Sequence, residues 1–95
     1  MSLEKLLNEP TATVIDVREP WEFEMGHVEG SVNIPLGTVP NKVAELKSMS
    51  KPLILCCASG NRSGQATMFL NGSGIADAYN GGSWMTVNSA KMAVQ

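Results

Sequence analysis

Short apolar stretches alternate along the chain with glycine, proline and polar residues. Four stretches rich in β-branched or aliphatic side chains predict strands, at Thr13–Val17, Ser31–Ile34, Pro52–Cys56 and Ile75–Tyr79. The third of them, PLILC, is apolar at almost every position, which is typical of a central strand covered on both faces. The sequence therefore predicts a sheet in which this strand is central.

Segments with helical spacing separate these strands. We expect helices around Leu3–Leu7, from Glu19 to Gly26 with Pro20 in the first turn, over Thr38–Lys47 with Thr38 as a cap, over Ser63–Asn71 with Gly72 and Gly74 ending it, and over Trp84–Met92. Glu22 and Glu24 are expected to form a solvated face of the second helix. Strands that alternate with helices over short connections indicate βα units. The predicted fold is a three-layer α/β domain with a central, mainly parallel sheet flanked by helices.

Composition limits the class of protein. The chain has 95 residues, of which 43% are hydrophobic and 17% charged, so residues 1–95 are expected to form a single globular domain. The net charge of −2 predicts no binding to nucleic acid, since such proteins carry a basic surface. The N-terminus lacks the apolar core of a signal peptide, and no apolar run approaches the ~20 residues that span a bilayer. We therefore expect a cytoplasmic protein with no membrane association.

The two cysteines, Cys56 and Cys57, are adjacent. A disulfide between neighbouring residues would strain the peptide that joins them, so a structural disulfide is not expected. Together with the one histidine they are too few for a zinc site, and we expect neither a metal nor a cofactor. Cys56 is interpreted as a small buried hydrophobe.

The segment that follows the PLILC strand carries the candidate chemistry. In open parallel sheets, ligands bind beyond the carboxyl ends of the strands. There the chain reads Cys57, Ala58, Ser59, Gly60, Asn61, Arg62 and Ser63, which leads into a helix. Small residues at a helix N-terminus can turn successive N–H groups inward and form an anion-binding nest, and Arg62 adds a permanent cation. At such sites thiol pKa values fall to ~3.5–7.5, so Cys57 is predicted to be a thiolate nucleophile.

Two other polar groups are predicted near this edge of the sheet. Asp16 and Arg18 end the first strand, so Arg18 either lends positive charge to the pocket or joins Asp16 in a network that fixes the loops. The second interpretation is favoured, because structural ion pairs are common near sites. The triplet of Asn80, Gly81 and Gly82 is expected to form a tight turn beside the loop.

Three motifs resemble the rhodanese (sulfurtransferase) homology domain: VIDVREPWEFEMGHVEGSVNIPL, the loop CASGNRSG, and YNGGSW, in that order. The resemblance covers about Val14 to Trp84. It implies a small α/β fold with a parallel sheet. It also implies that Cys57 accepts a sulfane sulfur as a persulfide and passes it to cyanide or a thiol. In this family the position of His27 belongs to a fold signature, so we expect His27 to be a hydrogen-bonded structural residue.

The resemblance implies a thiosulfate sulfurtransferase. The Cys57 thiolate would attack the outer sulfur of thiosulfate, a small anionic donor, and the amides from Ala58 to Ser63 would cradle the transferred atom. Arg62 would either steer the donor or fix the loop. Four residues separate Cys57 from Arg62, one fewer than in related phosphatase-type loops, which disfavours phosphatase or arsenate chemistry. Two further alternatives stay open: a sulfur relay whose acceptor is a protein thiol, and a non-catalytic binding module.

Overall fold

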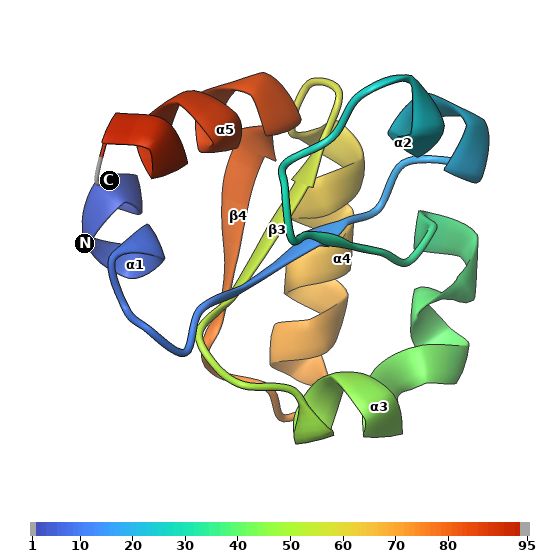
Figure 1. The fold of residues 1–95 in the computed structure, drawn as a ribbon. Coiled ribbons are helices and arrows are strands. Elements are labelled where there is room, and N and C mark those ends of the chain that lie inside the picture. The colour runs from blue at the N-terminus through green and yellow to red at the C-terminus, as the bar shows by residue number, and fades with distance from the viewer. Residues whose placement is uncertain (1, 94–95) are drawn as a thin grey trace.

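The computed structural model describes residues 2–93 and contains a four-stranded sheet. The sheet lies between two layers of helices (Figure 1). The strands are β1 (Thr13–Asp16), β2 (Val32–Asn33), β3 (Leu53–Cys57) and β4 (Ala78–Ser83). Their order is β2-β1-β3-β4 and every pairing is parallel, so β3 lies between β1 and β4. The predicted three-layer α/β fold with a parallel sheet is confirmed.

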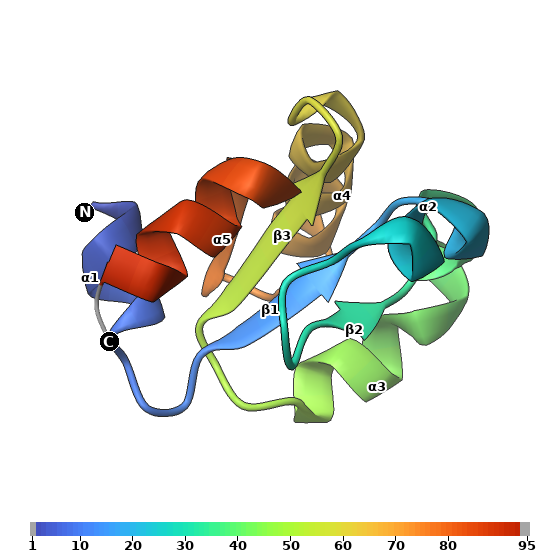
Figure 2. The same cartoon turned by 45° about the horizontal axis from the view of Figure 1, so that its top comes forward.

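The helices cover both faces of the sheet. On one face α1 (Leu3–Leu7) packs beside α5 (Trp84–Ala93). On the other lie α4 (Asn61–Gly72), the 3₁₀ helix η1 (Leu36–Lys42) and α3 (Val43–Ser48). The short helix α2 (Pro20–Met25) lies beside the carboxyl ends of the strands (Figure 2). No helix within residues 2–93 is long and apolar enough to cross a membrane.

The strand β3 separates two hydrophobic cores. Its side chains alternate between the faces of the sheet, as they do in any strand. Leu53, Leu55 and Cys57 belong to the core under α3 and α4, whereas Ile54 and Cys56 belong to the core under α1 and α5. All five are fully buried, which explains the continuous apolar sequence.

The third predicted helix and the second predicted strand differ from the structure. The segment expected to form one helix over Thr38–Lys47 is a 3₁₀ helix followed by α3, and Thr38 does not cap it but donates its hydroxyl to Pro35 O at 2.8 Å. Pro40 inside the segment removes an N–H group that a continuous α-helix would need. The second strand is also shorter than predicted, at two residues.

The fourth strand lies further along the chain than predicted, because the Asn80–Gly82 triplet is part of β4 rather than a turn. The register with β3 shifts between Leu55 and Cys56, so that Gly81 is an extra residue in a β-bulge. A side chain at Gly81 would meet Val87 Cγ2 at 2.7 Å and Ile54 Cγ2 at 2.9 Å. Glycine therefore allows β4 to pass close under α5.

Candidate active site

The loop of residues 57–63 joins the carboxyl end of β3 to the N-terminus of α4. Cys57 is the last residue of β3, and Gly60 is the N-cap of α4. Gly60 has φ +100°, a left-handed conformation that glycine adopts without strain. At Gly60 the backbone turns back toward Cys57, so N–H groups at the start of α4 face the sulfur.

The sulfur of Cys57 receives hydrogen bonds from the loop that follows it. Gly60 N donates to Sγ at 3.0 Å and Ser63 N at 3.4 Å, and Ser63 Oγ lies 3.4 Å away. Burial raises the pKa of the thiol, but the bonds from Ser63, Gly60 and the Ser59 N–H outweigh this, and the pKa falls to about 7. The side chain is fully buried beneath exposed Ala58 and Ser59, so its sulfur forms the floor of the loop.

Cys56 has the opposite environment, although it is the adjacent residue. It lies in the other core, and burial, followed by the negative charge of Asp16, raises its pKa to about 12. Cys56 therefore stays a neutral thiol at physiological pH. The structure agrees with its interpretation as a buried hydrophobe.

Asn80 joins the loop to β4; it was expected beside the loop as part of a turn, but its side-chain contacts were not predicted. Its Oδ1 accepts from Ser63 Oγ at 2.7 Å and from Gly82 N at 3.0 Å, and its Nδ2 donates to Gly60 O at 3.2 Å. The Gly82 N–H fixes the orientation of the amide, because only the oxygen can accept from it. Ser63 has one hydroxyl proton for two acceptors, Asn80 Oδ1 and Cys57 Sγ, whereas the backbone N–H groups of Gly60 and Ser63 face Cys57 whichever acceptor takes it.

Arg62 forms an ion pair with Glu22 of α2. Its Nη1 lies 2.7 Å from Glu22 Oε1 and its Nη2 lies 3.0 Å from Oε2, a bidentate geometry. The pair lowers the pKa of the Glu22 carboxyl to about 2 and raises that of Arg62. The expectation that Glu22 forms a solvated helix face is therefore wrong, whereas Glu24 is exposed as expected.

Asp16 and Arg18 form a second ion pair, which is buried. Arg18 Nη2 lies 2.8 Å from Asp16 Oδ2, and the side chains are 6% and 0% exposed. Arg18 also donates to Gly26 O at 2.7 Å and lies over the ring of Trp84, 4.9 Å from its centroid. These contacts bind β1, the end of α2 and the start of α5 together, which supports the structural interpretation of the pair.

His27 lies apart from the sulfur. Its Nδ1 is 2.7 Å from Phe23 O, and its ring stacks on that of Phe23 with centroids 3.7 Å apart. It borders a surface hollow of about 630 Å³ whose lining contains no residue of the loop: His27, Glu29, Gly30, Asn88, Lys91 and Met92. These contacts agree with the expected structural role.

Comparison with known proteins gives consistent matches. The family model of the rhodanese-like domain matches residues 2–85. A curated relative named thiosulfate sulfurtransferase GlpE, from Pseudomonas syringae, is 36% identical over 77% of this chain and 68% of its own length. The uncharacterized protein YqhL of Bacillus subtilis is 44% identical over 73% of this chain, and the match spans only 54% of that relative.

Solved structures of similar chains share the fold. A rhodanese with anions from E. coli superposes with a TM-score of 0.72 and 32% identity, over 79% of this chain and 89% of the other. The human single-domain sulfurtransferase TSTD1 superposes with a TM-score of 0.68 and 30% identity, over 82% and 80% of the two chains.

Proposed function

Because the chain belongs to the rhodanese-like domain family, we propose that it is a sulfurtransferase whose Cys57 carries the sulfur as a persulfide. The donor is thiosulfate or a related persulfide compound, and the acceptor is cyanide or a thiol. The observation that carries this proposal is the pair of backbone N–H groups, of Gly60 and Ser63, directed at Cys57 Sγ at the start of α4.

The reaction follows from the charge of the thiol. With a pKa of about 7, a large fraction of Cys57 is ionised at neutral pH without a general base. The thiolate attacks the outer sulfur of thiosulfate, a new S–S bond forms, and the old S–S bond breaks with its electron pair leaving on sulfite. The persulfide keeps one negative charge, which the helix N-terminus and the loop amides stabilise. An acceptor then removes the outer sulfur and regenerates the Cys57 thiolate.

Mass spectrometry of the intact protein tests this mechanism. Incubation with thiosulfate should add one sulfur atom, and cyanide should remove it with formation of thiocyanate. Cys57→Ser should abolish both steps, because the nucleophile is lost. The matched control Cys56→Ser should retain them, since that thiol has a pKa of about 12 and faces the other core. Loss of sulfur loading in Cys56→Ser but not in Cys57→Ser would refute the assignment.

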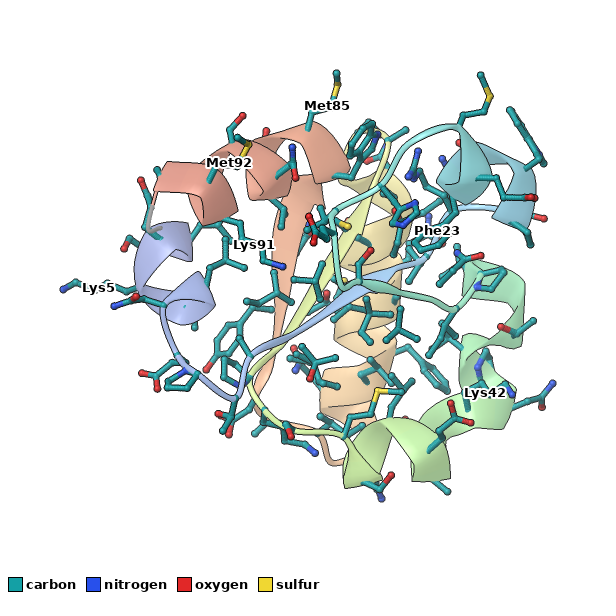
Figure 3. The ribbon with its side chains drawn as sticks, viewed as in Figure 1. Lys5, Phe23, Lys42, Met85, Lys91 and Met92 are labelled. Atoms are coloured by element: carbon teal, nitrogen blue, oxygen red, sulfur yellow. The ribbon has the colours of Figure 1, made fainter. Side chains whose placement is uncertain are left out.

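A sulfur relay to a protein thiol is the second candidate, favoured by exposed apolar side chains near the loop. Trp21 is 65% and Met25 82% exposed on α2, which Glu22 joins to the loop, and Met85 is 64% exposed at the start of α5 (Figure 3). Such side chains are typical of protein contacts. In this candidate, Trp21→Ser slows transfer from the loaded protein to a protein dithiol and leaves transfer to cyanide unchanged. Equal rates for both acceptors would reject it.

A further inference from the structure

The positive charge near Cys57 comes from two arginines, and carboxylates neutralise both. Arg62 is paired with Glu22, and Arg18 is buried against Asp16. The lysines lie elsewhere. Lys51 donates to carbonyls at the end of α3, Lys91 donates to Glu29 O, and Figure 3 shows Lys5 and Lys42 pointing outward on opposite sides of the molecule. Within residues 2–93, no lysine is recorded in contact with the loop.

Glu22 is held in position to neutralise Arg62. Its Oε1 also accepts from Glu19 N at 3.0 Å, a capping-box contact that fixes the carboxylate at the start of α2. The side chain of Glu22 is 16% exposed and that of Arg62 33%, so the pair is partly shielded from water and salt. Arg62 belongs to the first turn of α4, whose N–H groups face Cys57, and the negative charge of Cys57 adds to that of Glu22 in raising the pKa of Arg62.

Among the residues that the structure describes, the two pairs leave no net positive charge from side chains beside the loop. Asp16 and Glu22 contribute two carboxylates against the guanidinium groups of Arg18 and Arg62. The Cys57 thiolate adds a negative charge. A dianion approaching the loop is therefore repelled about twice as strongly as a monoanion of similar size.

We propose that Glu22 determines the donor specificity of this site: by neutralising Arg62, it favours sulfane donors with at most one negative charge over dianionic thiosulfate. The inference rests on the proposed sulfur transfer through Cys57. Two donors of nearly equal shape isolate the effect of charge. They are the dianion thiosulfate and the monoanion methanethiosulfonate, in which a methyl group replaces one oxygen. With the second donor, the thiolate takes the outer sulfur and methanesulfinate leaves with the electron pair of the broken S–S bond, so the step is otherwise the same.

The test is kcat/KM for both donors in wild type and Glu22→Gln, a variant that removes the charge and keeps the shape. Freeing Arg62 should raise kcat/KM about tenfold for thiosulfate and about threefold for methanethiosulfonate, because the interaction energy scales with donor charge. Both gains should shrink as salt is added. Glu24→Gln is the matched control, an exposed residue of the same helix with the same loss of charge, and should change either value less than twofold.

Further variants keep the test decisive if Glu22→Gln folds poorly. Arg62→Gln leaves the Glu22 carboxylate unpaired, so kcat/KM should fall for both donors. The fold decrease in kcat/KM for thiosulfate should be the square of the fold decrease for methanethiosulfonate, because thiosulfate carries twice the charge. The double variant Glu22→Gln, Arg62→Gln should return the donor ratio to the wild-type value. Equal changes for the two donors, or an equal effect of Glu24→Gln, would overturn the role of Glu22. Failure of wild-type Cys57 to gain sulfur from either donor would instead refute the sulfur transfer.

Discussion

Cys56 and Cys57 show how strongly a sheet can differentiate two identical side chains. Consecutive residues of β3 face opposite cores, so one thiol lies among apolar side chains and the other faces the N–H groups at the start of α4. Burial raises the pKa of Cys56 to about 12, whereas hydrogen bonds outweigh burial and lower that of Cys57 to about 7. At pH 7, only Cys57 has an appreciable thiolate fraction.

Alkylation rates should separate the two thiols. In Cys56→Ser, the rate of modification by iodoacetamide should rise with pH around a midpoint near 7, because the thiolate of Cys57 forms above this pKa. In Cys57→Ser, the folded protein should stay unreactive through pH 9, since Cys56 has a pKa of about 12 and lies in the core under α1 and α5. A midpoint near ~8.5 in Cys56→Ser, the value of a free thiol, would show that the loop amides do not stabilise the thiolate.

The residues of the candidate site differ in how far their roles could be predicted from the sequence. The prediction of Cys57 as the nucleophile rests on local signals: a strand end, a glycine and a helix start within a few positions. Glu22 was expected to face solvent and Asn80 to form part of a turn beside the loop; their side-chain partners Arg62 and Ser63 were not predicted, because these lie 40 and 17 positions away. The pattern of Glu19 and Glu22 did contain the capping box, which places the Glu22 carboxylate but does not reveal its partner.

At the scale of elements, β-branched runs and helical spacing located the strands and helices, but not the bulge of β4. The apolar pattern predicted a strand that ended before Asn80, since glycines normally weaken strands. In the structure β4 continues to Ser83, opposite Cys57, and this continuation brings Asn80 next to Ser63. The glycine is required by packing between layers, which no local pattern encodes.

Replacing Gly81 with alanine should destabilise the protein by about 1–3 kcal/mol, because the added carbon would overlap side chains of β3 and α5 and crowd Leu55 O. Urea unfolding followed by circular dichroism measures this change. Gly72→Ala is the matched control, since nothing lies within 4 Å of its added carbon at the end of α4. A loss of stability in Gly81→Ala no larger than in Gly72→Ala would contradict the close packing of β4 under α5.

At the scale of the whole molecule, the buried pair of Asp16 and Arg18 joins β1 to the end of α2 and to the start of α5. The carboxylate accepts four hydrogen bonds from Arg18, and the guanidinium reaches Gly26 after α2 and Trp84 at the start of α5. These segments surround the loop that holds Cys57. The pair is thus positioned to keep the edge of the sheet, α2 and α5 in one arrangement.

Asp16→Asn should therefore cost far more stability than the loss of a surface pair. Removing one partner of a buried pair leaves an uncompensated charge and typically costs about 3–5 kcal/mol, a large part of the ~5–15 kcal/mol of a small domain. Lys42→Gln is the control, because Lys42 and Glu45 are 3.7 Å apart and about half exposed, a pair worth at most about 1 kcal/mol. Urea unfolding at pH 7 measures the loss in free energy of unfolding for both variants. If the two variants lose equal stability, Asp16 and Arg18 do not hold these segments together, and the arrangement around Cys57 depends on the apolar cores alone.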